Sequence, residues 1–444
     1  MSDYKKTKIG NHTLKPETLM TSYGYDPEFS EGSVKPPVFL TSTFAYKTPE
    51  DGEEFFHMMA GRKPQPADSI GGLIYSRFNH PNVEIIEDRL AIYEGAESSI
   101  MFSSGMGAIS ATLLAYLRPG DVIAQSVPLY GGTETLIRKF LPEFGIETTD
   151  FTDGLDEDAM LASFREATKK GRLAMIFIET PANPTNTMVD FEALLRCVET
   201  IEKETGHRPL TVCDNTLLGP VFQRAVPQGI DIAMYSVTKY IGGHSDLVAG
   251  AVCGSRDVLR PIRSLRSALG LNLDPHTSWM ISRSLETLSI RMERAADSGR
   301  KVAAWLADNP YADTKLYHPE FTDDENYKRV YERQCSGPGS TFSFCLGNVS
   351  KADAFALINN LSIFKSAVSL GGSESLVCHP ASTTHSGVPI ELREKVGVTD
   401  CLIRLSIGLE HPDDLIVDLD NAFRKVFGDG VNQAHKDERK VSNG

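Results

Sequence analysis

Short apolar segments alternate with amphipathic, helix-like segments through the middle of the chain. The apolar segments cover residues 121–126, 173–180, 210–215, 231–237 and 248–254. Strands that alternate with helices are typical of a mostly parallel sheet with helices on its faces. The pattern therefore predicts an α/β domain that extends from about residue 73 to residue 287.

Different patterns precede and follow this region. Residues 1–72 show no steady periodicity, and the glycines and prolines near residues 58–72 indicate a loop-like insertion. A long helical pattern over 278–309 leads into residues 288–444, where the sequences STFSFCLG and CLIRLSIG predict strands of a smaller α+β domain. The polar tail at 432–444 is predicted to be disordered.

Composition and charge exclude several classes of protein. With 444 residues and 41% hydrophobic content, the chain is long enough for more than one domain with a sizeable core. Its net charge of -14 argues against nucleic acid or an anionic membrane as a partner. The polar N-terminal sequence predicts no secretory signal, and no segment approaches the roughly 20 apolar residues of a membrane span.

The cysteines are seven in number and scattered, with no C-x-x-C pair among them. Cys213, Cys253 and Cys345 lie inside apolar strand patterns. Buried cysteines without a paired spacing are typical of reduced thiols in an intracellular protein. The sequence therefore predicts reduced cysteines and a cytoplasmic location.

The sequence SVTKY at 236–240 places Lys239 directly after an apolar strand. A lysine at the end of a buried strand is costly unless it pairs or becomes neutral, and a neutral amine can form an imine with an aldehyde cofactor. Ser236 and Thr238 beside it could donate hydrogen bonds to a phosphate of that cofactor. Taken alone, the same pattern also fits a surface lysine at a strand end.

The sequence IMFSSGMGAISATLLAYL at 100–117 predicts an anion site. An apolar segment ends at Phe102, and a helical pattern begins at Ala108. Ser104, Gly105 and Met106 lie in the tight turn between them. Small residues let the backbone approach a phosphate, and the start of a helix presents free N–H groups. A dinucleotide fingerprint is less well matched because its third glycine is missing. A plain glycine-rich helix start is the other interpretation.

Two further apolar strands end in polar side chains. The first leads into Glu179 and Asn183, and Pro181 and Pro184 stiffen the loop that follows it. The second ends in Asp214, which could cap a helix or pair with the protonated nitrogen of a pyridine ring. Ligands bind at such strand ends in open α/β sheets. Together with the lysine downstream, these groups predict pyridoxal phosphate as the cofactor.

These motifs carry a resemblance to a known family. The sequences SSGMGA, YGGTE, ETPANP, DNT, SVTKY with IGGHSDL, SLGG with SES, HPASTTHS and RLSIGLE resemble the Cys/Met-metabolism family of pyridoxal-phosphate enzymes. The resemblance runs from about Tyr75 to the helix that begins near Asp413. It implies the type I fold of pyridoxal-phosphate-dependent transferases, with residues 1–72 as an arm that contributes to a neighbouring subunit.

The resemblance also implies an oligomeric active site. Tyr75 and Arg77, two residues apart on an extended segment, point to one side and would reach the phosphate of a neighbouring subunit in a homotetramer. Without the resemblance they would be read as surface residues. Tyr130, before Gly131 and Gly132, would stack on the pyridine ring and act as an acid or base near the leaving group. Lys239, Tyr130 and Asp214 are the expected catalytic residues.

Substrate binding is assigned to a second group of residues. Arg404 lies on an apolar strand and needs an anionic partner, so it is expected to bind the substrate carboxylate, with a structural salt bridge as the alternative. By resemblance, Ser369 and Asn183 assist it. His379 and His385 lack the support of other ligands at metal spacing, so no metal is expected.

Departures from better-known members of the family bear on the substrate. Gly132 occupies the position where methionine γ-lyases usually have a cysteine, which makes a methionine-specific pocket less expected. Glu374 resembles the cystathionine enzymes, and Ser373 stands where an apolar residue is common. The sequence thus predicts γ-elimination or γ-replacement on an amino acid with a polar γ-substituent, such as cystathionine, a homoserine ester or canavanine, with a γ-lyase favoured.

Other functions remain as alternatives. A cystathionine γ-synthase or O-acetylhomoserine sulfhydrylase would be a transferase and would need a second, nucleophilic substrate. A protein that binds the cofactor without catalysis is disfavoured by the intact set of Lys239, Asp214, Tyr130 and Arg404. An aminotransferase would share the lysine and the aspartate but would not be expected to carry the whole set of motifs.

Overall fold

The computed structural model describes residues 3–59, 61–64, 72–347 and 349–428. Its larger sheet has the strand order β3-β9-β8-β7-β6-β4-β5, in which β9 is antiparallel to both neighbours and the other pairs are parallel. The strands are β3 (Ser98–Phe102), β4 (Asp121–Ser126), β5 (Glu147–Phe151), β6 (Arg172–Glu179), β7 (Leu210–Asp214), β8 (Ile232–Tyr235) and β9 (Gly250–Gly254). The predicted mostly parallel α/β sheet is confirmed.

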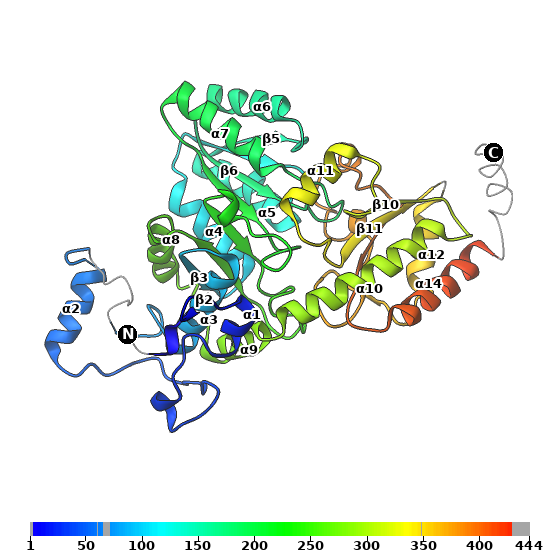
Figure 1. Ribbon diagram of the computed structural model, residues 1–444. Coiled ribbons are helices and arrows are strands. Elements are labelled where there is room, and N and C mark those ends of the chain that lie inside the picture. Colours follow the sequence, from blue (N-terminus) through cyan, green and yellow to red (C-terminus); the bar gives the residue numbers. More distant parts are fainter. Residues whose placement is uncertain (1–2, 60, 65–71, 348, 429–444) are drawn as a thin grey trace.

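Helices cover both faces of this sheet (Figure 1). The side chains of β6 alternate between two buried clusters, with Ile176 and Ile178 in one and Met175 and Phe177 in the other. The first cluster receives α3 (Pro81–Glu94), α6 (Glu157–Lys170), α7 (Phe191–Thr205) and α9 (Pro275–Leu285), and the second receives α4 (Gly105–Tyr116) and α8 (Arg256–Leu269). Burial on both faces explains why these strands are continuously apolar.

A smaller sheet follows in the sequence, with the strand order β10-β11-β14-β13-β12. All of its pairs are antiparallel except β12 with β13. Its strands are β10 (Thr314–Tyr317), β11 (Thr341–Leu346), β12 (Lys365–Ser366), β13 (Leu376–Cys378) and β14 (Leu402–Ser406). The helices α10 (Leu288–Asp308), α12 (Lys351–Asn359) and α14 (Pro412–Phe427) pack side by side and share one core with it (Figure 1).

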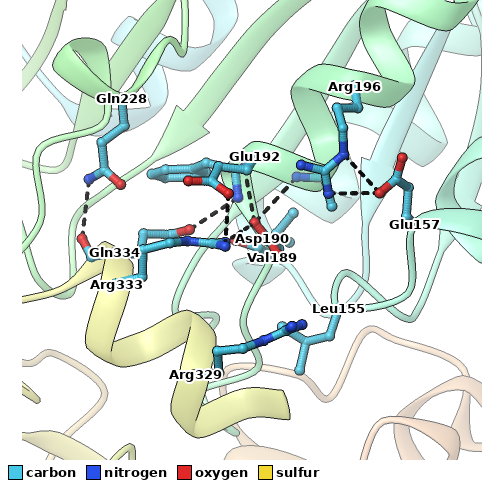
Figure 2. A network of polar contacts seen from close by, with 12 residues as sticks. Leu155, Glu157, Val189, Asp190, Glu192, Arg196, Gln228, Arg329, Arg333 and Gln334 are labelled. Atoms are coloured by element: carbon cyan, nitrogen blue, oxygen red, sulfur yellow. Dashed lines mark hydrogen bonds and ion pairs between the residues drawn. The ribbon is translucent and has the colours of Figure 1, made fainter.

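Helix α11 (Glu325–Gln334) ties this second sheet to the first. Arg333 pairs with Asp190, the N-cap of α7, and also lies 2.8 Å from a carboxylate oxygen of Glu192 (Figure 2). The adjacent Gln334 donates from Nε2 to Oε1 of the buried Gln223 at 3.1 Å. Buried polar side chains that satisfy each other fix one relative placement of the two sheets.

The N-terminal region contains a two-stranded hairpin of β1 (Lys8–Ile9) and β2 (His12–Thr13), followed by α1 (Pro16–Ser22) and α2 (Pro49–Met59). Figure 1 shows α2 and the chain before it projecting from the main body. Helix α2 enters the segment expected to be a loop-like insertion, and residues 60 and 65–71 lie outside the described residues. The tail expected to be disordered also lies outside them.

The long helical pattern at 278–309 corresponds to two helices, α9 and α10, which are separated at Thr287 with φ -116° and ψ 11°. One expectation was wrong. Not all cysteines are reduced, because Cys345 on β11 and Cys401 before β14 form a disulfide. The pairing of β11 with β14 joins cysteines that are 56 residues apart in the sequence, which spacing alone did not reveal. The domain boundaries and the cytoplasmic location stay predictions.

Candidate active site

Three neighbouring parallel strands end at the same edge of the larger sheet. In their register Glu179 at the end of β6 lies beside Asp214 at the end of β7, and Asp214 lies beside Met234 of β8. The chain continues from β8 through a turn to Lys239. This edge is where open parallel sheets bind ligands, so the three polar groups expected from the sequence are brought to one place.

Lys239 is held in a partly buried position with one hydrogen-bond partner. Its Nζ donates to Oγ of Ser369 at 2.9 Å. Burial, together with the smaller effect of the nearby charge of Arg404, lowers the pKa of Lys239 to about 8. At pH 7 this leaves about one amine in ten neutral, roughly 300 times the fraction of an ordinary lysine. The amine is therefore prepared to act as a nucleophile.

The start of α4 lies against the turn that carries Lys239. Ser104 is the N-cap, and its Oγ accepts the N–H of Gly107 at 2.9 Å. A Cβ on Gly105 would lie 3.2 Å from the side chain of Ser236, so the helix start lies against one of the predicted phosphate ligands. The free N–H groups at this helix start, which include that of Met106, suit an anion.

The two hydroxyls beside Lys239 differ in how they are used. Thr238 donates to the carbonyl of Ala249 at 3.1 Å and accepts the N–H of that residue at 3.0 Å. The structure shows no hydrogen bond from the Ser236 hydroxyl within the described part of the chain. Ser236 is thus the better placed of the two to donate to a phosphate.

Asp214 is a buried carboxylate with neutral partners. Its Oδ1 accepts the main-chain N–H of Thr216 at 3.1 Å and the hydroxyl of Thr216 at 2.6 Å. Burial raises the pKa of Asp214, whereas these hydrogen bonds lower it. Over the described ranges no ion pair engages this carboxylate. A protonated ring nitrogen would supply the missing cation, and Asp214 therefore fits the predicted cofactor.

Glu179 has a positioning role that the sequence did not reveal. Its buried carboxylate accepts the main-chain N–H of Tyr130 at 2.7 Å and that of Asn183 at 2.8 Å. Burial, and secondarily the neighbouring Asp214, raise the pKa of Glu179 well above its usual range. One side chain thus holds the loops that carry Tyr130 and Asn183. The position of Glu179 at a strand end was the only signal of this role.

Arg404 lies on β14 and faces the same region. Its Nη1 donates to Oδ1 of Asn183 at 2.9 Å, and its Nη2 donates to the carbonyls of Val368 and Ser369 at 2.9 and 2.8 Å. The residue is only 2% exposed, and no ion pair engages it among the residues described. The structural salt bridge that the sequence also allowed is therefore absent from that part of the chain, and Arg404 is left with charge to offer an anionic ligand.

Tyr130 folds over Gly132. A Cβ on Gly132 would lie 2.6 Å from Cε1 of the Tyr130 ring and 3.1 Å from Sδ of Met106. Any side chain at this position would therefore require the ring to move. Tyr130 is 43% exposed in the single chain, so part of the residue is accessible to a ligand.

Glu374 belongs to a segment that packs against the lysine turn. Gly371, with φ +75°, lies so close that a Cβ would be 2.7 Å from the main-chain nitrogen of Tyr240. Glu374 accepts hydrogen bonds from the hydroxyls of Ser245 and Ser373. Burial acts to raise the pKa of Glu374, but these hydrogen bonds outweigh it and the pKa is lowered. Its carboxylate is therefore charged at neutral pH.

Tyr75 and Arg77 are not brought to this group. Arg77 donates from Nη1 to the carbonyl of Ser267 at 3.0 Å, and its guanidinium lies 4.5 Å from the ring centre of Phe78. Tyr75 is 40% exposed and forms a bridge with Thr43. Neither contact involves the residues around Lys239. A role at the phosphate of a neighbouring subunit stays a prediction.

When bound, pyridoxal phosphate withdraws electrons from the α-carbon of an amino acid. The residues present fit this group. They comprise a lysine with a lowered pKa, a helix start for the phosphate, and a buried carboxylate and an arginine that form no ion pair with any residue the structure describes. The described ranges contain no group of three or more His, Cys, Asp or Glu arranged to hold a metal ion. In the same ranges, no helix combines the length and apolar character needed to cross a membrane.

Comparisons with known proteins agree with this geometry. The model of the family described as Cys/Met metabolism PLP-dependent enzyme matches residues 17–424. An L-methionine gamma-lyase of Fusobacterium nucleatum is 35% identical over 96% of this chain and 100% of its own length. A cystathionine gamma-lyase of Bacillus subtilis is 34% identical over 93% of this chain and 100% of its own length.

A solved structure is similar over nearly the whole fold. The cystathionine gamma synthase of Xanthomonas oryzae pv. oryzae, in complex with aminoacrylate and cysteine, has a TM-score of 0.81 and 30% identity, covering 94% of this chain and 99% of its own. The predicted fold class and cofactor are confirmed, and the relatives support a carbon–heteroatom lyase. The chain belongs to the Cys/Met metabolism family of pyridoxal-phosphate-dependent enzymes.

Proposed function

We propose that the chain catalyses γ-elimination from an L-amino acid with a polar γ-substituent. The observation that carries this proposal is the hydrogen-bonded series from Lys239 through Ser369 to Arg404 and Asn183. It connects an amine that can exchange protons with an arginine that can bind a carboxylate. An amino acid held by its carboxylate at Arg404 would present its α-carbon toward Lys239.

In this mechanism the residues of the chain bind the substrate and move protons. Arg404 and Asn183 fix the substrate carboxylate, and Lys239 removes the proton from the α-carbon. Lys239 would pass this first proton to the bound cofactor, and its neutral Nζ could then take a proton from the β-carbon, which allows the γ-substituent to leave. The phenol hydroxyl of Tyr130, a residue that is 43% exposed, protonates the leaving group.

The nature of the γ-substituent is inferred from two features. The Tyr130 ring occupies the space that a cysteine side chain would need at position 132. The pocket near the leaving group therefore has a different shape from one with a cysteine at that position. Glu374, held by Ser245 and Ser373, offers a charged carboxylate to a cationic group such as an amine or guanidine. Relatives named methionine gamma-lyases are among the most similar proteins, so methionine is a necessary comparison substrate.

A panel of γ-substituted amino acids tests the proposal. Canavanine, cystathionine, O-acetylhomoserine and methionine would be assayed for 2-oxo acid, ammonia and homoserine, with and without a thiol nucleophile. Release of 2-oxo acid and ammonia without a second substrate supports a γ-lyase. Turnover only with the nucleophile would instead identify a γ-synthase or sulfhydrylase, the transferase alternative.

Glu374 is predicted to set the preference for a cationic substituent. Its replacement by Ala or by the isosteric Gln should lower kcat/KM for canavanine and cystathionine by about 10- to 150-fold, because a charge-assisted hydrogen bond contributes roughly 1.5–3 kcal/mol. The kcat/KM for methionine should change by less than about threefold. Methionine as the best substrate of the native enzyme, or an equal loss for all four substrates, would contradict this prediction.

We also propose that the enzyme is a homotetramer built from dimers with shared active sites. Large apolar side chains are exposed along the N-terminal arm, with Phe29 67%, Val34 80% and Leu40 81% exposed. Such a surface is typical of an interface in a protein that assembles. In this arrangement the arm, Tyr75 and Arg77 would contact the neighbouring subunit.

Shared sites can be tested with hybrid dimers. Arg77→Ala alone should lack the phosphate contact, and Lys239→Ala alone should lack the essential amine. Mixed dimers should regain up to about one half of the native activity per dimer, because one of the two sites receives both native residues. Mixed dimers of verified composition that remain as inactive as either parent would argue against shared sites.

A further inference from the structure

A buried histidine beside the proposed carboxylate site has no role in the reaction proposed for this enzyme. His385 is 2% exposed and lies in the loop between β13 and α13 (Ile390–Lys395). Its Nδ1 lies 2.9 Å from Oγ1 of Thr384, and its Nε2 is buried with no hydrogen-bond partner among the described residues. A buried polar atom without a partner is unusual and calls for an explanation.

The surroundings of His385 belong to three active-site elements. Burial lowers the pKa of His385 to about 4, and the charge of Arg404 acts in the same direction. Main-chain groups of Asn183 and Leu129 oppose this shift, as carbonyl acceptors near the ring would. The imidazole is therefore neutral, and it lies close to the strand of Arg404 and to the loops that precede Tyr130 and contain Asn183.

The loop that carries His385 also fits tightly against the loop of Tyr130. A Cβ on Gly131 would lie 2.3 Å from the carbonyl oxygen of Thr384. The Tyr130 loop is also held by Glu179, which accepts the N–H of Tyr130. Two independent contacts therefore confine the Tyr130 loop, and the residue next to His385 makes one of them.

We propose that His385 is a positioning residue, which holds the Asn183 and Tyr130 loops against Arg404 so that the guanidinium is aimed at the substrate carboxylate. This inference rests on the proposed role of Arg404. This role requires a neutral ring, because a charged imidazole would repel the guanidinium of Arg404. With Nε2 protonated, the ring would donate to a main-chain carbonyl of Asn183 or Leu129, the two groups that oppose the lowering of its pKa.

The chain offers a matched control in His318. This histidine is 3% exposed, burial lowers its pKa to about 4, and its Nε2 also has no partner among the described residues. It packs against the rings of Phe321 and Phe342. Phe342 pairs with Leu405, so its side chain lies on the opposite face of the sheet from Arg404. Substitution of His318 shows how much the removal of a buried imidazole elsewhere in the chain changes glycine binding and thermal unfolding.

The test measures the affinity of the holoenzyme for glycine, which has the amine and carboxylate of a substrate but no side chain. Glycine would be titrated against the absorbance of the bound cofactor in His385→Leu, His385→Gln and His318→Leu, with thermal unfolding measured in parallel. We expect at least tenfold weaker glycine binding in His385→Leu. Binding within threefold of native is expected for His385→Gln, whose amide can still donate, and for His318→Leu. If His385→Leu does not fold, His385→Phe takes its place.

Arg404→Met separates this inference from the proposed function. If Arg404→Met weakens glycine binding but His385→Leu leaves it within threefold of native, the inference on His385 is overturned and the carboxylate site stands. An equal loss of glycine affinity in His385→Leu and His318→Leu also overturns the inference on His385. If Arg404→Met leaves glycine binding unchanged, the proposed role of Arg404 fails, and the inference fails with it.

Discussion

Replacing Lys239 by alanine should lower kcat/KM by at least about 10³-fold, because one residue supplies both the covalent attachment and the proton transfers. As a control, Lys301→Ala at an exposed position of α10 should leave kcat/KM unchanged. Reduction of the native holoenzyme with borohydride should fix the cofactor to Lys239, as peptide mass spectrometry would show. Label on another lysine, or on none, would contradict the assignment.

The pKa of about 8 adds a pH signature to this prediction. The native pKa of Lys239 lies below its ordinary value of 10.5. The fraction of neutral, reactive amine therefore increases as the pH rises toward 8, and nearly all of the amine is neutral above pH 9. Addition of cofactor to the cofactor-free protein should therefore accelerate about tenfold from pH 6 to pH 7 and level off above about pH 9. An acceleration that continues to pH 10 would indicate an ordinary lysine.

Asp214→Asn should lower kcat/KM by about 30- to 5000-fold, because loss of one partner from a buried charge pair costs roughly 2–5 kcal/mol. The amide keeps the shape of the carboxylate and can still accept from Thr216, but it cannot balance a positive ring nitrogen. Thr216→Val is the matched control, since it removes a hydrogen bond of about 1 kcal/mol from the same carboxylate without removing the charge.

Kinetic constants and the dissociation constant of the cofactor, both measured on the same preparations, check this second prediction. Asp214→Asn should lower kcat/KM at least tenfold more than Thr216→Val does. An Asp214→Asn enzyme within threefold of native activity would show that this carboxylate only caps the turn at Thr216, which is the alternative that the sequence left open.

The sequence predicted the larger sheet well because its strands are buried on both faces. The predicted strand at 121–126 agrees with β4 (Asp121–Ser126), and the strand expected at 173–180 agrees with β6 within one residue at each end. Polar side chains at the ends of such strands lie together by geometry alone. The strand pattern is therefore sufficient to place Lys239 and Asp214 at one edge of the sheet.

Contacts between distant segments could not be predicted in the same way. The hydrogen bond from Lys239 to Ser369 joins residues 130 apart, and the one from Arg404 to Asn183 joins residues 221 apart. Both depend on how the second sheet docks on the first, about which local pattern carries no information. The disulfide of Cys345 with Cys401 was missed for the same reason, because strand pairing creates it.

The docking of α11 has a consequence for protein engineering. Arg333 and Gln334 satisfy Asp190 and Gln223 on the first sheet, so a chain cut between the two sheets would leave buried polar groups of both halves without partners. The halves should therefore not fold as separate soluble proteins. A chimera that takes its C-terminal half from a relative would need to inherit compatible residues at 190 and 223 together with those at 333 and 334.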